Sequence, residues 1–416
     1  MTAYTLRPYQ QAAVDASLAY LQDRKLAGRN GIVVQPTGGG KSLVIAALCD
    51  RLDAPALVFQ PSREILEQNA EKLAHYGYRA AVFSASLGRR EVGRITLATV
   101  GSVMRYPEVF RDVRYVLVDE CHAVNARGGM YDEFLAGLAG VRVLGLTATP
   151  FRLASNSFGS ELRFLTRTRP RVFRDVVHVT QVQDLVRAGW WAPLRYLTDR
   201  TVVDRSRLKL NSKGSDYTDE SVQGHLLEVG FVGELQAAVE RQLDEGRRNV
   251  LVFTRFVNES ERLAKAVPGT AVVTAETPPQ ERAQILSDYR RGKIRVVSNV
   301  GIIALGFDFP ELECVVLGRP SISLALYYQQ VGRGVRPHPA KAYTQVVDLV
   351  GLTHLFGKAE DLTLRKVGAG SDQWVMASGA RHLTNIYFSD RDSVNPKIAA
   401  KAIATRRYWA KRRRRA

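Results

Sequence analysis

The segment from Val33 to Ser42 has the residue types that a phosphate-binding loop requires. An apolar run (Gly31 to Val34) leads into a glycine-rich turn, and an apolar helical stretch (Leu43 to Leu52) follows it. Backbone N–H groups converge on an anion in such a turn, and the dipole of the following helix favours negative charge. The sequence therefore predicts a phosphate site made of Thr37, Gly38, Gly39, Gly40, Lys41 and Ser42.

Lys41 and Ser42 have the clearest predicted roles within this loop. The amino group of Lys41 can reach the β- and γ-phosphates of a nucleotide, and the hydroxyl group of Ser42 can ligate Mg²⁺. The general motif has a glycine five residues before Gly40, where this chain has Gln35. An ordinary flexible turn is an alternative interpretation of the segment taken alone, and the other motifs of the chain argue against it.

Two adjacent carboxylates, Asp119 and Glu120, follow the apolar run from Tyr115 to Val118. Ligands of open parallel sheets bind at the carboxyl ends of the strands. Phosphoryl transfer to water needs one group to hold Mg²⁺ and another to orient or deprotonate the water. We expect Asp119 to hold the metal and Glu120 to activate the water, although an isolated Asp-Glu pair is more often a solvated turn. The next residues, Cys121-His122, are not predicted to form a nucleophile pair or a metal site, because adjacent strand residues point to opposite faces.

A third candidate set, Gln329, Arg333 and Arg336, lies much later in the chain. Two arginines three residues apart share one face if the segment is helical. Guanidinium groups in that arrangement can stabilise the charge that develops on a γ-phosphate. Taken alone, such a string is usually a solvated basic turn. Its functional interpretation requires the second half of the chain to face a nucleotide held by the first half.

Strands and helices alternate along the chain, which predicts parallel, doubly wound sheets. In the first block the predicted strands are 31–34, 56–59, 95–100, 115–119 and 141–146. A helix from Pro61 to about Tyr76 has Ser62 as its predicted N-cap. In the second block the predicted strands are 250–253, 271–274, 294–298, 314–317 and 345–349, with helices at 260–267, 280–291 and 323–331. We therefore predict an α/β fold with two lobes, residues 1–195 and 196–350, and a short basic C-terminal extension, residues 351–416.

The charge balance predicts a polyanionic partner. The 416 residues include 59 Lys and Arg against 41 Asp and Glu, a formal net charge of +18, which favours nucleic acid over a membrane. After position 360 there are 13 basic and 4 acidic residues, and the chain finishes in Lys411-Arg412-Arg413-Arg414-Arg415. The three cysteines have no Cys-x-x-Cys spacing, which argues against structural zinc and a disulfide framework. No apolar run approaches the ~18 residues that a membrane span requires.

The motifs, taken in order, resemble those of the helicase superfamily 2 core of the DExH type. The three sets above resemble its phosphate loop (Pro36 to Ser42), which does not require the glycine replaced by Gln35, its motif II (Asp119-Glu120-Cys121-His122) and its motif VI (Gln329-x-x-Gly332-Arg333-x-x-Arg336). Other segments resemble the strand-contacting motif Ia (Gln60 to Glu64), the next backbone-contacting motif (Thr99 to Ser102), the coupling motif III (Thr147 to Thr149) and motif V (Ser298-Asn299 with Gly306-Phe307-Asp308).

This resemblance implies two RecA-like lobes with ATP·Mg²⁺ in the cleft between them. It implies that Arg7 and Gln10 contact adenine, that Gly306 and Asp308 contact the nucleotide, with Asp308 at the ribose, and that Gln329 contacts the nucleotide or its attacking water. Arg333 and Arg336 are implied to reach the phosphates when the cleft closes. Nucleic acid is implied to cross the opposite face of both lobes.

Several of these segments also resemble bacterial RadD-type DNA-repair helicases, although no cysteine follows Cys314 to form the zinc segment of those proteins. This implies an ATP-hydrolysing DNA helicase or translocase in repair or recombination, cytoplasmic and associated with the nucleoid. Three alternatives stay open: a helicase acting on RNA, the motor subunit of a restriction-type nuclease, and a non-catalytic platform that binds nucleic acid. Repair proteins or single-strand-binding proteins are conceivable partners that the sequence does not identify.

Overall fold

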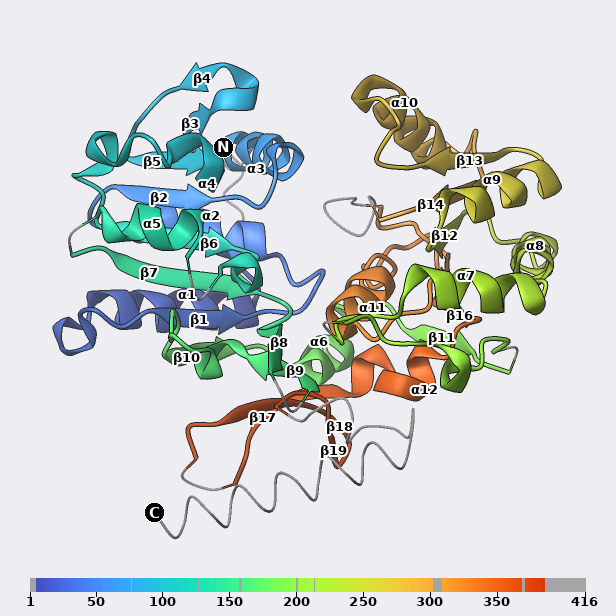
Figure 1. The fold of residues 1–416 in the computed structure, drawn as a ribbon. Coiled ribbons are helices and arrows are strands. Elements are labelled where there is room, and N and C mark those ends of the chain that lie inside the picture. The colour runs from blue at the N-terminus through green and yellow to red at the C-terminus, as the bar shows by residue number, and fades with distance from the viewer. Residues whose placement is uncertain are drawn as a thin grey trace, which may run out of the picture. The chain divides into compact units, whose positions relative to one another are not determined.

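A computed structural model describes residues 5–385, except 76, 126–127, 139, 157–158, 200, 213, 302–308 and 369–370. The chain forms two compact units (Figure 1). The first contains Met1–Arg152, Arg163–Gln181 and Leu364–Val375, and the second contains Leu153–Leu162, Val182–Thr363 and Met376–Ala416. The domain boundaries near residues 195 and 350 stay predictions.

An eight-stranded sheet with the strand order β10-β1-β7-β6-β2-β5-β3-β4 forms the centre of the first unit. All neighbouring strands are parallel except the antiparallel pair β3–β4 at one edge. The strands are β1 (Gly31–Val34), β2 (Ala56–Phe59), β3 (Ala81–Ser84), β4 (Arg89–Arg90), β5 (Ile95–Ala98), β6 (Tyr115–Asp119), β7 (Arg142–Thr147) and β10 (Asp175–Val179). The five predicted strands are confirmed, because each is a short apolar run whose side chains are almost all buried in the sheet.

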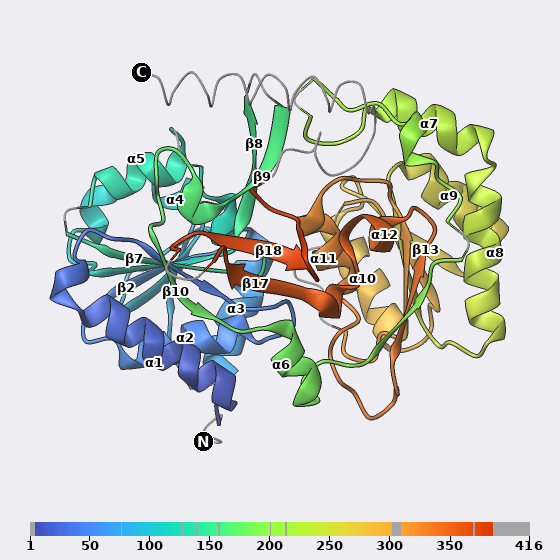
Figure 2. The ribbon, with the colours of Figure 1, turned by 90° about the horizontal axis from the view of Figure 1, so that it is seen from below.

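Helices cover both faces of this sheet (Figure 2). The first three lie on one face and the next two on the other: α1 (Pro8–Gln22), α2 (Lys41–Arg51) and α3 (Arg63–His75), then α4 (Val100–Val103) and α5 (Met130–Ala136). The hydroxyl oxygen of Ser62 accepts a hydrogen bond from the backbone N–H of Ile65 (3.3 Å), which confirms Ser62 as the N-cap of α3. This helix therefore starts at the carboxyl end of β2, at the same sheet edge as the phosphate loop.

The second unit is built on a six-stranded, fully parallel sheet with the order β11-β16-β15-β12-β14-β13. Its strands are β11 (Leu194–Leu197), β12 (Val250–Thr254), β13 (Thr270–Val273), β14 (Val296–Asn299), β15 (Cys314–Gly318) and β16 (Thr344–Asp348). Its helices are α6 (Val182–Arg187), α7 (Asp219–Glu228), α8 (Phe231–Asp244), α9 (Val257–Ala266), α10 (Pro279–Arg290), α11 (Leu324–Val331) and α12 (Leu352–Phe356). Helices α8 and α9 lie on one side of the sheet, and α10 and α11 lie on the other (Figure 2). Two parallel sheets with helices on both faces confirm the predicted α/β fold.

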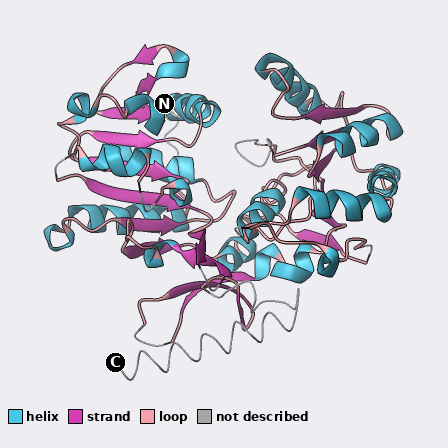
Figure 3. Ribbon diagram, in the orientation of Figure 1, coloured by secondary structure: helices cyan, strands magenta, loops and turns pink. Residues whose placement is uncertain are grey.

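Two small sheets complete the described structure (Figure 3). One is the two-stranded sheet of β8 (Phe151–Asn156) and β9 (Gly159–Phe164). The other has the order β17-β18-β19, formed by β17 (Leu362–Lys366), β18 (Trp374–Ser378) and β19 (Arg381–His382). Residues 352–385, the start of the predicted basic extension, thus contain regular elements, whereas the terminal Lys-Arg run lies outside the described residues.

A glycine in β7 allows β7 to pack closely against motif II. A Cβ atom at Gly145 would lie 2.5 Å from both Cβ and Sγ of Cys121 and 2.9 Å from the ring of Phe173. Because a well-packed core does not accept an extra methyl group without strain, we expect Gly145→Ala to lower the free energy of unfolding by about 1–3 kcal/mol. Urea unfolding measures this change.

The matched control for this prediction is Gly224→Ala in α7, where nothing lies within 4 Å of the place that the added methyl group would take. There the same substitution should raise stability by roughly 0.5–1 kcal/mol, because alanine has the better helix propensity. Equal effects at the two positions would contradict the packing described for β7 and Cys121.

Candidate active site

Three strand ends lie side by side at one edge of the first sheet, because β7 lies between β1 and β6. Strand β1 leads into the glycine-rich loop, β6 ends at Asp119 and β7 ends at Thr147. The backbone N–H of Gln35 donates to the carbonyl of Thr147 (3.0 Å), so the end of β7 supports the start of the loop. The predicted phosphate loop and the predicted carboxylates therefore share one sheet edge.

The loop has the backbone conformation that only glycine adopts without strain. Gly38 and Gly40 have φ angles of 76° and 77°. A Cβ atom at Gly40 would also lie 2.4 Å from Nε2 of Gln10. Helix α2 then begins at Lys41 with no side chain capping its first turn. The N–H of Leu43 donates to the carbonyl of Gly40 (3.0 Å), and the N–H groups of Lys41 and Ser42 precede it at the helix N-terminus, where an anion binds favourably.

Three side chains hold the loop through a single carbonyl group, that of Gly39. It accepts hydrogen bonds from the hydroxyl of Tyr9 (3.0 Å), from Nε2 of Gln10 (3.1 Å) and from Nε2 of Gln35. Gln35, which replaces the glycine of the general motif, thus braces the loop from inside, and it is fully buried. Neither the Tyr9 nor the Gln35 contact follows from sequence spacing.

Both polar atoms of the Gln10 side-chain amide form hydrogen bonds in this structure. Besides donating to Gly39, it accepts a hydrogen bond from the backbone N–H of Arg7 (3.0 Å) through Oε1. The side chain is buried, with 4% of its surface exposed. The adenine contacts of Arg7 and Gln10 stay predictions, and the structure adds a direct bond between Gln10 and the phosphate loop.

Lys41 forms an ion pair with Glu120, with 3.0 Å between Nζ and Oε1. Both side chains are largely shielded from solvent, with 14% and 17% of their surfaces exposed. The backbone of Glu120 has a φ angle of 48°, and its N–H donates to Oδ1 of Asp119 (3.0 Å). A left-handed conformation costs a residue with a side chain on the order of 1–3 kcal/mol, and such strain is concentrated at functional sites. The structure therefore brings the predicted phosphate-binding lysine and the predicted base together.

The two neighbouring carboxyl groups differ in acidity. Burial raises the pKa of Asp119 to about 6, and the adjacent Glu120 carboxylate acts in the same direction while Lys41 opposes both. Burial also opposes ionisation of Glu120, but Lys41 and His122 outweigh it and hold the pKa of Glu120 well below its usual range. Glu120 is thus a carboxylate at neutral pH, whereas Asp119 holds its proton more tightly, and a positive charge beside it would favour its ionised form.

Motif II does not continue as a strand beyond Asp119, which corrects the geometry assumed for Cys121 and His122. The chain turns into a short 3₁₀ helix, η4 (Cys121–Ala123), because Glu120 is left-handed. Cys121 is buried in the core, where burial raises the pKa of its thiol well above the usual value. Strand alternation therefore does not apply to Cys121 and His122, and the prediction that they form neither a nucleophile pair nor a metal site stays a prediction.

His122 instead links motif II to the end of β7. Its Nδ1 atom lies 3.2 Å from Oε2 of Glu120, 3.0 Å from Oγ1 of Thr147 and 3.1 Å from Oγ1 of Thr149. The hydroxyl of Thr147 also donates to Oε2 of Glu120 (3.3 Å). Together these contacts orient the Glu120 carboxylate from the side opposite Lys41.

The second arginine set lies at the end of α11 in the second unit. This helix ends at Val331, so Arg333 and Arg336 follow it in a turn and do not share a helical face. Nε of Arg333 donates to the backbone carbonyl of Gln329 (3.3 Å), and Arg333 is 7% exposed. The turn is held by Lys341, whose Nζ donates to the carbonyl of Gly334 (2.8 Å). A role of Gln329, Arg333 and Arg336 at the nucleotide stays a prediction.

The motif V segment is described only in part. Ser298 and Asn299 are buried at the end of β14, where Nδ2 of Asn299 donates to the carbonyl of Val252 (2.9 Å). Gly306 and Asp308, the predicted nucleotide contacts, lie outside the described residues. Their roles stay predictions.

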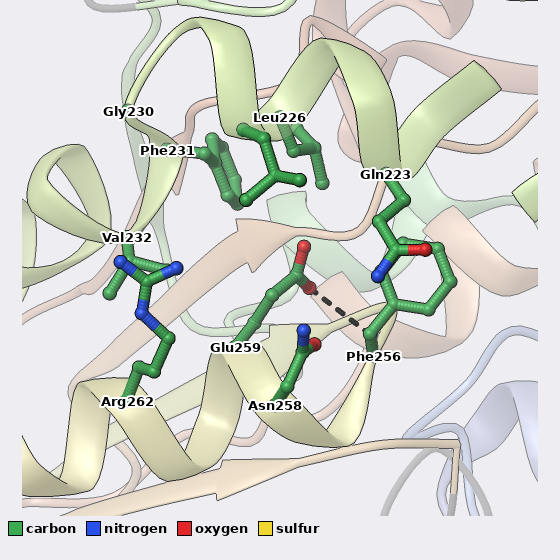
Figure 4. Close-up of a pocket in the computed structure, with 10 residues that line it drawn as sticks. Gln223, Leu226, Gly230, Phe231, Val232, Phe256, Asn258, Glu259 and Arg262 are labelled. Carbon is green, nitrogen blue, oxygen red and sulfur yellow. Dashed lines mark hydrogen bonds between the residues drawn. The ribbon is translucent and has the colours of Figure 1, made fainter. Parts of the chain in front are cut away.

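A hollow of about 480 Å³, partly open to solvent, lies between α7, α8 and α9 of the second unit (Figure 4). It is lined by Gln223, Leu226, Leu227, Gly230, Phe231, Val232, Phe256, Asn258, Glu259 and Arg262. The carboxylate of Glu259 accepts the backbone N–H groups of Arg255 and Phe256, so it caps the start of α9. None of the predicted site residues lines this hollow, and its one carboxylate has a structural role.

The described part of the chain contains neither a metal-binding cluster nor a membrane span. Within it, no group of three or more His, Cys, Asp and Glu residues could hold a metal ion. No helix there is long and apolar enough to span a bilayer. A site formed by Ser42 and Asp119 is compatible with the first finding, because Mg²⁺ commonly takes one or two protein ligands and completes its shell with substrate phosphates and water.

The folds of the two units and the residues of the phosphate loop define a protein with two RecA-like lobes. Two family models match the chain, one in its first half and one in its second half. Residues 3–152 match the model described as type III restriction enzyme, res subunit, and residues 234–338 match the helicase conserved C-terminal domain. A 51.5 kDa protein of a Lactococcus phage (isolate 7-9) is 26% identical over 333 residues, which cover 78% of this chain and 67% of that protein. The DNA 3'-5' helicase XPB of Kineococcus radiotolerans is 26% identical over 363 residues, which cover 82% of this chain and 60% of that protein.

A solved structure gives the same result at the level of fold. A fragment of a putative HsdR subunit of a type I restriction enzyme from Vibrio vulnificus YJ016 matches with a TM-score of 0.59 and 18% identity, covering 84% of this chain and 65% of that chain. The two family matches and the helicase relatives together support a helicase superfamily 2 core. It spans about half to two thirds of the length of the first relatives it matches. The narrower resemblance to RadD-type proteins stays a prediction.

Proposed function

We propose that this protein is an ATP-dependent DNA helicase or translocase that hydrolyses ATP at the carboxyl edge of the first sheet. The observation that carries the proposal is the ion pair between Lys41 and Glu120 beside Asp119 and an open glycine-rich loop. The family models supply the context, because both halves of a helicase core are matched in order.

In this proposal the first unit binds the nucleotide and prepares the water. The loop N–H groups and Lys41 hold the phosphates, and Ser42 and Asp119 hold Mg²⁺, for which their hard oxygen atoms are suitable ligands. The metal would neutralise charge on the β- and γ-phosphates. When Lys41 turns to the phosphates, Glu120 loses its partner and its basicity rises, because the lysine no longer stabilises the carboxylate. Glu120 then accepts the proton of the attacking water.

The second unit completes the site in the same proposal. Arg333 and Arg336 stabilise the phosphate charge that develops during hydrolysis, and Gln329 contacts the nucleotide or its water. Gly306 and Asp308 approach the nucleotide, with Asp308 at the ribose, while Arg7 and Gln10 contact adenine from the first unit. Closing and opening of the two units around ATP then moves the protein along a nucleic acid strand.

DNA is the favoured strand, and two of the three alternatives also describe an ATP-driven motor. The net charge of +18 suits any nucleic acid, while the XPB relative is named a DNA helicase. A motor subunit of a restriction-type nuclease is favoured by the name of the first family model and by the HsdR fragment. An RNA helicase would use the same phosphate contacts, because these carry no sequence information. Action on DNA would place the protein at the nucleoid in the cytoplasm.

Phosphate release is the test of this proposal, measured with single-stranded DNA, forked DNA, duplex DNA and RNA at matched nucleotide concentrations. We expect Mg²⁺-dependent hydrolysis that is stimulated most by DNA carrying a single-stranded segment. Stimulation by RNA alone would replace the proposal with the RNA alternative, and stimulation by long duplex alone would favour the restriction-type motor. No hydrolysis with any of these would leave only a non-catalytic platform.

The terminal basic run makes a separate prediction about DNA affinity. Lys411 and the four arginines after it carry five positive charges. Replacing these five residues with glutamine should reduce the slope of log affinity against log salt by up to about 4 to 5 units, because fewer counterions are released. Affinity for ATP should not change. Equal slopes for the two proteins would show that this run does not contact DNA.

A further inference from the structure

Three polar side chains, two of them buried, form a continuous hydrogen-bonded chain that starts at the end of the phosphate loop. The hydroxyl of Ser42 donates to Oδ1 of Asn69 (2.8 Å), and Nδ2 of Asn69 donates to Oε1 of Gln60 (2.7 Å). Asn69 is 6% exposed and Gln60 is 1% exposed. These residues come from three elements: the first turn of α2, the middle of α3 and the loop that follows β2.

The direction of these bonds determines what Ser42 can do. A serine hydroxyl has one hydrogen and two lone pairs. Since the hydrogen of Ser42 is given to Asn69, both lone pairs of Oγ are left to face a cation. Asn69 can accept that hydrogen only while its carbonyl faces Ser42, and the bond from its NH₂ group to Gln60 keeps it in this orientation. Without this arrangement the hydroxyl hydrogen could point toward the metal and repel it.

The other end of the chain is attached to the segment that starts α3. The backbone N–H of Gln60 donates to the carbonyl of Ala98 (2.8 Å), which fixes Gln60 to the neighbouring strand end. The next residues, Pro61 to Glu64, cap and begin α3, and Arg63 and Glu64 are exposed. This is the segment that resembles the strand-contacting motif Ia. Asn69 therefore lies between a proposed Mg²⁺ ligand and a proposed nucleic-acid contact.

We infer that Asn69 is a positioning residue with two roles. It orients the Ser42 hydroxyl toward Mg²⁺, and through Gln60 it transmits the binding of Mg²⁺ and nucleotide to the nucleic-acid contact at the start of α3. The inference rests on the proposed function, since it takes Ser42 as a metal ligand and Gln60–Glu64 as a strand contact. Asn69 touches neither ligand itself, and acts through its neighbours.

The first test measures the Mg²⁺ requirement for nucleotide binding, using a fluorescent ADP with the full chain and no nucleic acid. Mg²⁺ should increase the affinity for ADP, and in Asn69→Ala the Mg²⁺ concentration that gives half of this increase should rise by about 10- to 100-fold. This is the usual effect of losing a group that orients a metal ligand. Binding of ADP in excess chelator should be unchanged. Asn69→Asp keeps an acceptor for the Ser42 hydrogen and should restore the low requirement.

The matched control is Asn249→Ala in the second unit. Asn249 is equally buried, and its amide also bridges two groups, the carbonyl of Glu311 and the N–H of Glu313. This variant should bind Mg²⁺·ADP as the wild type does. If Asn69→Ala has the same Mg²⁺ requirement as Asn249→Ala, the orienting role of Asn69 is overturned.

The second test measures the coupling between nucleotide binding and DNA binding. The coupling is a ratio of two affinities for single-stranded DNA, the affinity with a Mg²⁺-bound, non-hydrolysable ATP analogue divided by the affinity without it. Such couplings are commonly about 5- to 150-fold. Gln60→Ala removes only the second bond of the chain and leaves Asn69 in place to accept the Ser42 hydrogen, so it should raise the Mg²⁺ requirement less than Asn69→Ala does while bringing the ratio close to one. An unchanged ratio in Gln60→Ala and Asn69→Ala would overturn the transmitting role. A ratio of one in the wild type would instead count against the proposed function, and the Mg²⁺ titration would still decide the orienting role.

Discussion

Glu120→Gln is expected to bind ATP·Mg²⁺ but to hydrolyse it about 10² to 10⁴-fold more slowly than the wild type. The amide has the shape of the carboxylate and can still contact Thr147 and His122, but it cannot accept a proton from water. Loss of the ion pair to Lys41 should leave the lysine free for the phosphates, so nucleotide affinity should not fall. Single-turnover hydrolysis and equilibrium binding of a fluorescent nucleotide measure the two quantities separately.

Two further variants make this result specific. Lys41→Ala should weaken nucleotide binding itself, in contrast to Glu120→Gln. Glu91→Gln removes an exposed carboxylate of the same unit, paired with Arg89 (3.0 Å), and should behave as the wild type. Hydrolysis by Glu120→Gln at the rate of Glu91→Gln would remove Glu120 from the role assigned to it.

Arg336→Ala is expected to reduce hydrolysis by roughly 10³-fold or more if it stabilises the phosphate charge in the transition state. Arg333→Ala should have an effect of the same order, but Arg333 is only 7% exposed, so its loss also removes packing. Arg336, which is partly exposed, is therefore the cleaner test. Hydrolysis should be compared at saturating ATP, and thermal unfolding should be recorded for each variant.

The control for the arginines is Arg241→Ala on α8. Arg241 is an exposed arginine of the same unit that pairs with Glu245 along the helix (3.0 Å). Its loss should lower the free energy of unfolding by no more than about 0.5 kcal/mol and should leave the rate of ATP hydrolysis unchanged. If Arg336→Ala hydrolyses ATP as Arg241→Ala does, the second unit does not contribute to the active site.

The central strands could be predicted from the sequence because their burial is nearly complete. Strands β1, β2 and β6 have the predicted bounds, and β15 extends one residue further. Strands β4 and β10 were not predicted, because β4 is two exposed arginines and β10 lies at an edge where its residues are only half-buried. Helix α8 was also missed, although Phe231, Leu235 and Val239 recur at helical spacing and are buried.

The site could be predicted in residue types but not in its connections. Lys41 and Glu120 were identified by their positions after strands, and the structure adds that they touch. Asn69 belongs to none of the motifs, so its role could not be recognised from the sequence. The structure reveals it, because α3 packs beside α2 and places Asn69 next to Ser42. The departure at Gln35 was a usable signal, since a large polar residue in a loop of small ones needs a partner, which is the carbonyl of Gly39. The turn at Glu120 could not be foreseen, because non-glycine residues rarely adopt positive φ.

ATP-driven movement along DNA is the central claim, and displacement of streptavidin from the end of a biotinylated single strand measures it most directly. The assay uses the full chain, Mg²⁺ and excess free biotin, with biotin placed at either end of the strand. We predict displacement from one end that requires ATP and is lost in Glu120→Gln, while Glu91→Gln displaces as the wild type does. DNA-stimulated hydrolysis without displacement from either end, or displacement by Glu120→Gln at the wild-type rate, would contradict the account.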